Sequence, residues 1–484
     1  MVFLAFPPVR DTWHHGIKIV IIQCFCYFIK GTVIASEATV NLYLVFSIGK
    51  NIIEPKLNNM EQQAVKKVVV VGGGFAGINF VKRLANDNRF LITLVDINNY
   101  HFLPPLLYQV ATAFIEPSNI SYPFRRLFQE KKNLRFHLGC LSRINPATNT
   151  IETDTGVLEY DYLVLAVGTE TNYFGMENVK KNSLPMKTIN DALNLRNFLL
   201  LNMEKAVRTN DLKEKEKYLN IVIAGGGPTG VEIAGMLAEM GREIAAKEYP
   251  EIKDLQTHLY LIDAGPVLLG PMSKKSQEEA TKVLSGLGVH IILNTAVKDY
   301  NDGNVVLADG KIIESNVLIW ASGVTGREVI GLPTEIIVKG RRIKVDEYNK
   351  IMGTENIFAL GDICFQTTDK NFPNGHPQLA QVAIQQGKLL GENLKRLISN
   401  KPLKPFVYND KGSMAIISKF KAVVDLPKGF FKGFFAWIVW LFIHIIPLVG
   451  FRNKVKLAFS WFWSFITNDP TLRLIIRPRK EDMK

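Results

Sequence analysis

Short apolar runs and helical apolar patterns alternate through the middle of the chain. Residues 68–71 are four consecutive valines, a composition typical of a strand buried on both faces of a parallel sheet. Apolar residues then recur from Ile78 to Ala85 at intervals of three and four, the spacing of one helix face. The same order returns at residues 221–224, with a helix expected from Val231. The pattern predicts two strand–turn–helix units, each opening an α/β domain.

A glycine-rich turn joins strand and helix in the first unit, with the spacing G-x-G-x-x-G. Gly72 permits the tight turn, Gly74 lets the backbone approach a pyrophosphate, and Gly77 lets helix and strand pack closely. The next strand ends in Asp96, 19 residues after Gly77, where an acid accepts a hydrogen bond from a ribose hydroxyl. The residues predicted to bind this dinucleotide are Gly72, Gly74, Phe75, Ala76, Gly77 and Asp96.

The second unit repeats the turn and again places an acid after the following strand. From Gly230 to Asp263 there are 33 residues, longer than usual, and the charged stretch 242–256 is read as an insertion at the helix end. No arginine follows Asp263, so a 2′-phosphate would meet an acid without a counter-charge, which favours NAD over NADP. The residues predicted to bind this dinucleotide are Gly225, Gly227, Thr229, Gly230 and Asp263.

A third signal comes late in the chain. An apolar strand at residues 356–360 ends in Gly361 and Asp362, whose carboxylate can reach a ribityl hydroxyl. A helix follows Pro377, and its N-terminus would stabilise negative charge on a reduced flavin. We therefore expect non-covalent FAD in the first unit and NADH in the second, with the NAD domain inserted into the FAD domain.

These elements predict an α/β fold with two Rossmann-like domains, in the architecture of disulfide-reductase-like flavoproteins, followed by an amphipathic, membrane-anchoring helical segment. The predicted parts are an N-terminal extension outside the core fold (1–66), the first part of the FAD domain (67–178), the NAD domain (179–325), the second part of the FAD domain (326–405) and a C-terminal membrane-anchor region (406–484).

Composition narrows the function. Hydrophobic residues make up 47% of the chain and charged residues 21%, which excludes wholesale disorder. Four cysteines exclude a disulfide scaffold and a cysteine-rich zinc site, and we predict no metal. Residues 75–139 contain no cysteine, so the redox pair of a dithiol reductase is missing near the first helix. Electrons must therefore leave through a diffusible acceptor.

The net charge of +13 is concentrated at the C-terminus, where residues 401–484 hold 15 Lys and Arg against 5 Asp and Glu. The same segment contains the apolar, aromatic stretch 434–451 and the triplet Trp461-Phe462-Trp463. This combination favours a helix in an anionic membrane surface over a nucleic-acid site. Eighteen residues rise about 27 Å, marginal for a bilayer core of about 30 Å. A monotopic or peripheral anchor is thus preferred over a single span, the other reading being a buried helix pair. An acceptor in the membrane is a quinone.

Residues 1–59 allow three readings. Residues 19–29 form an 11-residue apolar run flanked by Lys18 and Lys30. This run would serve a cleaved signal or an extra membrane contact. Alternatively, an ordinary enzyme begins at Met60, and residues 1–59 are an extension that the fold does not need.

Four segments carry a family resemblance. Residues 99–111 read NYHFLPPLLYQVA, 227–232 read GPTGVE, 320–324 read WASGV, and 380–387 read AQVAIQQG. On these segments the chain closely resembles the type II, non-proton-pumping NADH:quinone oxidoreductases of respiratory chains. The resemblance runs from about residue 66 to about residue 467. Its departures are Asp96 and Asp263, where glutamate is common, and Ser322, where alanine is common.

The resemblance implies site residues. It places Glu232 near the nicotinamide and Gln381, Gln385 and Gln386 at the quinone, whose carbonyl oxygens their amides can bind. Gln381 and Glu232 are also predicted cofactor contacts, as are Gly168 and Gly323. His101 is read as structural, packing near the FAD. Glu232 and Lys419 are weak candidates for the proton donor to quinone.

The implied location is the cytoplasmic face of the inner (plasma) membrane, with a homodimer among the alternatives. The runner-up functions are a sulfide:quinone oxidoreductase and an apoptosis-inducing-factor-like or ferredoxin-reductase flavoprotein. The first would need catalytic cysteines near the flavin, and Cys140 and Cys364 alone, together with the intact NAD fingerprint, argue against it. The segment AQVAIQQG and the C-terminal anchor argue against the second. A non-enzymatic membrane scaffold is weaker still.

Overall fold

The computed structural model describes residues 64–242, 246–252, 255, 258–467 and 472–476 of the 484-residue chain. These residues belong to one compact unit. The predictions for residues 1–59 lie outside the described residues.

The first glycine-rich turn lies in a parallel sheet whose strands run in the spatial order β22–β9–β1–β2–β5. Val68 and Val70 face helices α2 (Phe75–Leu84) and α12 (Ala380–Leu397), whereas Val69 and Val71 face two small sheets on the other side. The valine run is therefore buried on both faces, as predicted. The five strands are β1 (Lys66–Val71), β2 (Phe90–Asp96), β5 (Leu134–Leu138), β9 (Tyr162–Leu165) and β22 (Ile357–Ala359).

The second turn lies in a parallel sheet of the same design, with strands in the order β11–β18–β12–β13–β14. Ile223 packs against the helical side, and Val222 packs against a small antiparallel sheet. Both predicted α/β units are therefore present. The five strands are β11 (Leu184–Pro185), β12 (Ile221–Ala224), β13 (Leu259–Ile262), β14 (Val289–Ile292) and β18 (Val317–Trp320).

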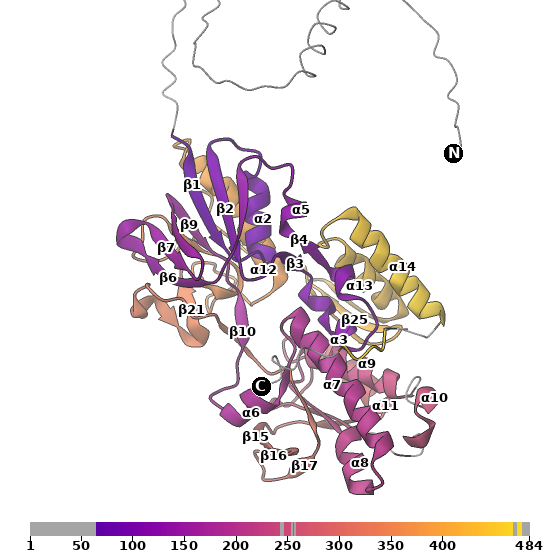
Figure 1. Cartoon of the computed structure of the whole chain (residues 1–484). Helices are drawn as coiled ribbons and strands as arrows, with labels where there is room; N and C mark the ends of the chain where they lie inside the picture. The colour runs from indigo at the N-terminus through magenta and orange to yellow at the C-terminus, as the bar shows by residue number, and fades with distance from the viewer. Residues whose placement is uncertain (1–63, 243–245, 253–254, 256–257, 468–471, 477–484) are drawn as a thin grey trace, which may run out of the picture. The chain divides into compact units, whose positions relative to one another are not determined.

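Helices α2 (Phe75–Leu84) and α12 (Ala380–Leu397) lie side by side on the first sheet, although they are far apart in sequence (Figure 1). Two glycines of α12 make this approach possible. A Cβ on Gly387 would lie 2.3 Å from the carbonyl oxygen of Ala76, and one on Gly391 would lie 2.6 Å from the Cβ of Arg83. Together with the pairing of β22 with β9, this packing joins the two ends of one discontinuous domain.

A narrow ribbon connects the two parallel-sheet regions. Strands β10 (Thr169–Thr171) and β19 (Val324–Gly326) pair antiparallel, one leading into the second sheet region and the other returning from it. Gly168 and Gly323 adjoin these strands. The ribbon accounts for how the second region is inserted into the first.

The C-terminal region contains the predicted helical segment, but a three-stranded antiparallel sheet that was not predicted comes before it. The strands are β24 (Ser413–Ser418), β25 (Lys421–Leu426) and β26 (Gly429–Gly433), followed by α13 (Phe434–Ile445) and α14 (Phe451–Thr467). Their buried side chains join the core formed by α3 (Leu107–Ala111), α7 (Ile189–Arg208) and α9 (Pro228–Met240). No helix among the described residues is long and apolar enough to cross a membrane.

Smaller elements complete the described structure. Three antiparallel pairs or sheets cover the parallel sheets: β6 (Leu141–Asn145), β7 (Thr150–Thr153) and β8 (Gly156–Glu159); β15 (Val297–Asn301), β16 (Asn304–Leu307) and β17 (Ile312–Glu314); β3 (Tyr100–Phe102) and β4 (Ser121–Pro123). A mixed sheet contains β20 (Ile337–Val338), β21 (Arg342–Lys344) and β23 (Cys364–Phe365). The remaining α-helices are α4 (Pro117–Ile120), α5 (Phe124–Leu127), α6 (Glu177–Asn182), α8 (Leu212–Leu219), α10 (Ala246–Glu248) and α11 (Lys274–Gly286). The stretch 242–256, read as an insertion, holds α10 and a short 3₁₀ helix, Pro250–Ile252.

Candidate functional site

The first glycine-rich turn has tight and open positions. Gly72 has a φ of +105°, and a Cβ there would lie 2.2 Å from the carbonyl oxygen of Ala166. A Cβ on Gly77 would lie 1.9 Å from the carbonyl oxygen of Gly72. In contrast, a Cβ on Gly74 would meet no atom of the protein. The open side of Gly74, at the N-terminus of α2, therefore fits the close approach of a pyrophosphate.

The second turn repeats this arrangement. Gly225 has a φ of +112° and faces the carbonyl oxygen of Ala321, while a Cβ on Gly230 would lie 1.8 Å from the carbonyl oxygen of Gly225. Again the middle glycine, Gly227, has open space before it, at the N-terminus of α9. Thr229 is exposed on the first turn of that helix. The residues present thus fit a dinucleotide at each turn.

Each predicted acid also holds its own glycine-rich turn. The carboxylate of Asp96 accepts a hydrogen bond from the backbone N–H of Gly73 at 2.6 Å. Asp263 accepts one from Gly226 at 2.5 Å with one oxygen and one from Gly265 at 2.6 Å with the other. The two acids therefore fix the turns in addition to any bond to a ribose.

His101 supports the first turn from inside. Its Nδ1 lies 3.0 Å from the carbonyl oxygen of Gly73, and its ring meets that of Phe75 edge to face. Burial lowers the pKa of His101 to about 4, so the ring is neutral near pH 7. Burial also raises the pKa of Asp96, while bonds from Asn98 and Gly73 and the charge of Arg327 oppose that shift.

Two hydrogen bonds in series lead from Lys187 through Thr169 to Asp362, the acid expected at the ribityl chain of the flavin. The ammonium of Lys187 donates to the hydroxyl of Thr169 at 2.7 Å, and that hydroxyl donates to the Asp362 carboxylate at 3.3 Å. Burial lowers the pKa of Lys187, and the charge of Asp362 opposes the shift. Lys187 and Thr169 carry no motif, so the sequence analysis missed them. Thr169 is the first residue of β10, and Lys187 lies between β11 and α7.

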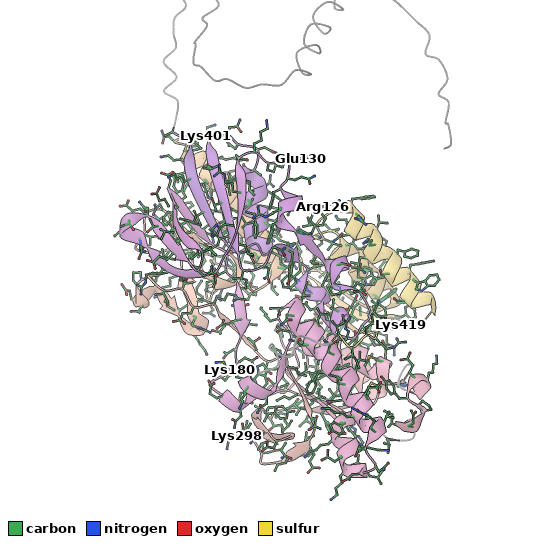
Figure 2. All side chains as sticks on the ribbon, in the orientation of Figure 1. Arg126, Glu130, Lys180, Lys298, Lys401 and Lys419 are labelled. Atoms are coloured by element: carbon green, nitrogen blue, oxygen red, sulfur yellow. The ribbon has the colours of Figure 1, made fainter. Side chains whose placement is uncertain are left out.

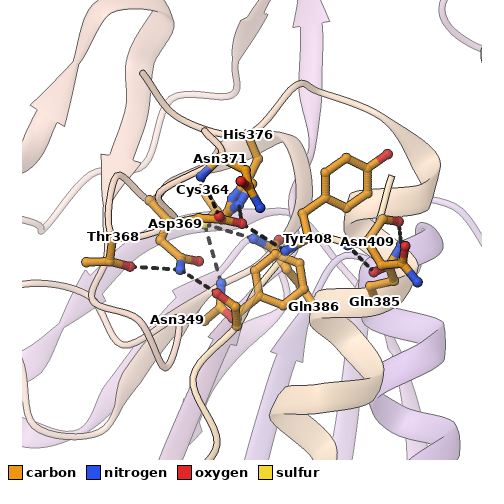
Figure 3. Close-up of polar contacts among 12 residues, drawn as sticks. Asn349, Cys364, Thr368, Asp369, Asn371, His376, Gln385, Gln386, Tyr408 and Asn409 are labelled. Carbon is orange, nitrogen blue, oxygen red and sulfur yellow. Dashed lines mark hydrogen bonds and ion pairs between the residues drawn. The ribbon is translucent and has the colours of Figure 1, made fainter. Parts of the chain in front are cut away.

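Figure 3 shows the polar contacts around α12. Gln385 donates to the carbonyl of Asn409 at 2.9 Å and accepts from its N–H at 3.1 Å. One turn earlier, Gln381 donates to the carbonyl of Gly412 at 2.8 Å. The two amides share a helix face and bind residues 409–412, so a ligand carbonyl would have to compete for them.

Gln386 was expected to contact quinone, but its side chain is buried in the core. Its side chain is 1% exposed, and its oxygen accepts a hydrogen bond from the backbone N–H of Gly361 at 2.7 Å. Its nitrogen points to the thiol of Cys364 at 3.5 Å. One residue beyond Gln385 lies about 100° around the helix, which turns Gln386 into the core. We therefore assign Gln386 the role of holding the backbone of Gly361 in place.

A buried pair fixes the segment that the two glutamines bind. Asp369 and His376 are both buried, and the His376 Nε2 lies 3.0 Å from the Asp369 carboxylate (Figure 3). The same carboxylate accepts the backbone N–H of Tyr408 at 2.9 Å. Asp369 therefore ties the loop before α12 to the start of residues 408–412.

Glu232 lies where α9 crosses the C-terminal sheet. It is 7% exposed, and the backbone N–H of Ile416 donates to its carboxylate. Burial raises its pKa well above the ordinary value, with the bond from Ile416 opposing the shift. Seven residues on, Glu239 accepts the backbone N–H of Lys419 at 2.7 Å. Burial and the charges of both acids raise the pKa of the Tyr108 hydroxyl.

The cysteines rule out dithiol chemistry in the described part of the chain. Cys140 is exposed, Cys364 is buried, and both are free. Burial raises the pKa of the Cys364 thiol to about 11, opposed mainly by the charge of Arg342. The thiol is therefore protonated near neutral pH and is a poor nucleophile.

The two C-terminal helices divide their aromatic residues between core and surface. Trp437 and Trp440, which the composition assigned to a membrane, are buried in the protein at 6% and 0% exposure. The side chains that face outward are Phe434, Phe435, Phe442, Ile443, Ile446, Phe451, Val455, Phe459, Phe462 and Trp463. Arg452 and Lys456 are exposed among them, and Figure 2 labels Lys419 near the same helices. We call these outward residues the apolar face.

Comparison with known proteins agrees with this arrangement. Residues 66–387 match the family described as pyridine nucleotide-disulphide oxidoreductase, and residues 411–468 match the NDH2 C-terminal domain. The type II NADH:quinone oxidoreductases Ndh and NdhA of Mycobacterium tuberculosis are 33% and 34% identical to this chain. Each alignment covers 83% of this chain, and 88% and 87% of the relative, respectively.

Solved structures share the fold. NDH2 from Plasmodium falciparum in complex with NADH has a TM-score of 0.77 at 22% identity, covering 85% of this chain and 100% of that one. A sulfide:quinone oxidoreductase from Aquifex aeolicus has a TM-score of 0.62 at 20% identity, covering 86% and 94%.

Proposed function

This chain belongs to the type II NADH:quinone oxidoreductase family, and on that premise we propose how its residues divide the oxidation of NADH and the reduction of quinone. The enzyme binds NADH and a flavin. We assign the flavin as non-covalent FAD because the turn at Gly72–Gly74 and the acid Asp96 form a complete dinucleotide unit. The matching unit with Gly227 and Asp263 is assigned to NADH.

A bound flavin supplies the redox chemistry, taking a hydride from NADH and giving two electrons to quinone. The protein's residues align the two partners, since hydride transfer needs no acid or base. Asp362 would face the ribityl chain, with Thr169 and Lys187 behind it. Gly168 and Gly323 adopt positive φ where they adjoin the connecting ribbon, and Glu232 would lie on the nicotinamide side.

We place quinone at the first turns of α12, beside Gln381 and Gln385. Their amides are neutral, and each can donate to a carbonyl oxygen in exchange for its present bond to residues 409–412. Gln386 supports the site through Gly361. Lys419 holds its place by a backbone bond to Glu239 and stays a weaker candidate proton donor than Glu232.

The apolar face is proposed to lie in an anionic membrane surface. Nine large apolar side chains of α13 and α14, and Ile446 just after α13, are exposed beside basic residues such as Arg452 and Lys456. We propose peripheral or monotopic binding to the cytoplasmic face of the inner (plasma) membrane, where NADH is available. A homodimer stays a prediction, to be decided by light scattering of the detergent-solubilised enzyme.

The observation that carries this function is the joint presence of two dinucleotide units and the paired amides of α12. The test is flavin absorbance of the purified protein under anaerobic conditions. NADH should bleach the flavin, and quinone should restore it. A protein whose flavin NADH cannot reduce, or quinone cannot reoxidise, would contradict the proposal.

A sulfide:quinone oxidoreductase is disfavoured because Cys364 is buried and protonated and Cys140 lies apart on the surface. Sulfide should leave the flavin absorbance unchanged. The apoptosis-inducing-factor-like and ferredoxin-reductase alternatives do not account for the amides of α12. Reoxidation of the reduced flavin by quinone also distinguishes the proposed function from these alternatives.

A further inference from the structure

Three buried side chains connect α14 to the centre of the protein. The indole N–H of Trp461 donates to the Oε1 of Gln109 at 2.8 Å, and the Nε2 of Gln109 donates to the hydroxyl of Tyr108 at 3.0 Å. All three side chains are 2% exposed. The first bond joins residues 352 positions apart in the chain.

The donors and acceptors fix a direction along this connection. An indole N–H can only donate, so it holds the amide oxygen of Gln109 toward Trp461. The amide nitrogen must then face Tyr108 and donate to its oxygen. A phenol has a single hydrogen, which is left free to point away from Gln109.

Helix α3, which carries Tyr108, packs in the same core as α9, which carries Glu232 and Glu239. Burial and the charges of both acids raise the pKa of Tyr108, whereas the bond from Gln109 opposes the shift. Glu232 is itself fixed by the backbone N–H of Ile416. The hydroxyl hydrogen of Tyr108 is thus free to turn toward α9, where Glu232 is buried next to the proposed reaction centre.

Helix α14 is well placed to control this orientation. Asn453, Leu457, Trp461 and Ser464 form its buried stripe, while Phe451, Val455, Phe459 and Phe462 point outward. Asn453 also donates to the carbonyl of Ser121 at 2.8 Å, and Asn119 donates to Ser460 at 3.0 Å. The helix that carries half of the apolar face is therefore hydrogen-bonded to the core along its other side.

We propose that Trp461 and Gln109 are positioning residues for quinone reduction, orienting the Tyr108 hydroxyl toward Glu232 and so coupling the seating of α14 to the reaction centre. This inference rests on the proposed function. In that reaction NADH, one proton and quinone become NAD⁺ and quinol, and protons enter only where the quinone oxygens are reduced. Hydride transfer needs none, so a misdirected hydroxyl should slow the quinone half alone.

The test uses the full-length, flavin-loaded enzyme in detergent with a soluble short-chain quinone, so that membrane binding plays no part. Trp461→Phe removes the indole donor and keeps an aromatic ring. Trp440→Phe is the matched control, because Trp440 is fully buried, 6.2 Å from Trp461 between ring centroids, and its N–H has no partner. Stopped-flow absorbance measures flavin reduction by NADH and reoxidation by quinone separately.

We expect Trp461→Phe and Tyr108→Phe each to slow reoxidation about tenfold, with reduction by NADH changed less than about twofold. Trp440→Phe should match the wild type in both steps. In a double-mutant cycle, Trp461→Phe should add nothing once Tyr108 is Phe, because its effect passes through that hydroxyl. Gln109→Glu keeps the bond to Trp461 but makes the second oxygen an acceptor, and it should slow reoxidation like Tyr108→Phe.

Equal slowing of both half-reactions, additive effects in the cycle, or the same loss in Trp440→Phe would overturn the inference in favour of a packing role. Thermal melting and flavin content of each variant identify any that fail to fold; if one does, the comparison of Gln109→Glu with Trp440→Phe decides in place of the cycle. If the wild type itself fails to pass electrons to quinone, the proposed function fails instead.

Discussion

The carbonyl oxygen of Ile417 packs directly against the Cα of Gly235. A Cβ on Gly235 would lie 1.6 Å from that oxygen, which leaves room for glycine alone. Gly235 lies on α9 between Glu232 and Glu239, and both acids accept backbone N–H groups of the 416–419 stretch. The close approach of α9 to β24 therefore brings the C-terminal region within hydrogen-bond reach of both acids.

Gly235→Ala should push α9 and β24 apart and destabilise the protein by about 3 kcal/mol or more, because backbone cannot yield as a side chain can. Gly241→Ala, at the end of the same helix, is the control. A Cβ there meets nothing, and alanine in helical conformation should stabilise by about 0.5–1 kcal/mol. Thermal or urea unfolding measures both. Equal stability of the two variants would show that the close approach is unimportant.

Substitution of Asp96 and of Asp263 should show that each acid serves a different nucleotide site. Asp96→Ala should lose FAD during purification, since the turn at Gly73 loses its acceptor. Asp263→Ala should retain FAD, raise the KM for NADH and narrow the preference for NADH over NADPH, because the repulsion of a 2′-phosphate is removed. Flavin content and kcat/KM for both coenzymes measure this. Equal kcat/KM for NADH and NADPH in the wild type would refute the role given to Asp263.

The glutamines of α12 should fall into two classes. Gln385→Ala should raise the KM for quinone about fivefold, the loss expected for one neutral hydrogen bond, and leave flavin reduction by NADH unchanged. Gln386→Met should instead lower stability by about 1–3 kcal/mol and reduce FAD content, because the N–H of Gly361 loses its buried acceptor. Lys388→Ala, on the exposed side of the helix, is the control. The same phenotype for Gln385 and Gln386 would contradict the division.

Glu232 should make stability depend on pH. Its pKa is raised in the folded protein, so the folded state keeps a proton that the unfolded chain releases above about pH 4.5. The stability that Glu232 contributes is full below that pH and falls as pH rises toward the folded-state pKa. Glu232→Gln removes this dependence and can still accept the N–H of Ile416. Melting temperatures from about pH 5 to about pH 8 should therefore fall more steeply for the wild type. Parallel curves would contradict the assignment.

The apolar face should govern membrane binding. Phe442→Ser and Phe462→Ser each remove an exposed aromatic ring, and each should weaken binding to anionic liposomes roughly tenfold, from about 1–2 kcal/mol of lost burial. Leu138→Ser, at an exposed apolar residue on β5, should leave binding unchanged. Added salt should weaken the contribution of Arg452 and Lys456 and spare the apolar part. Sedimentation with liposomes measures all three. Deleting the segment is less informative, since its inner side chains belong to the shared core.

The two nucleotide units could be predicted because their information is local. A valine run, three glycines and an acid at the end of the next strand specify the turn with few distant contacts. Both turns accordingly have the predicted tight and open positions. The roles of Gln385 and Gln386 were harder to separate, although the 100° between neighbouring helix positions already implied that both could not share one face.

The C-terminal region was predicted less well because its composition was read as a whole. Strands β24–β26 were missed, since their apolar residues merged with those of α13 and α14. Composition also cannot tell inward from outward tryptophans. Trp440 and Trp461 are buried, and Trp463 is 53% exposed, yet all three belong to one aromatic cluster in sequence. The hydrogen bond from Trp461 to Gln109 depends on packing between segments far apart in the chain, and no local pattern predicts it.

The split of the first sheet has a consequence for biosynthesis. Strand β9 and helix α2 leave the ribosome early, but their partners β22 and α12 emerge only after the whole inserted region, which has its own sheet and can fold first. Until then, the face of α2 that receives Gly387 stays open to water. The nascent chain therefore carries an incomplete, apolar half-domain through most of its translation, and this half should be the part most dependent on chaperones and most prone to aggregate when synthesis stops early.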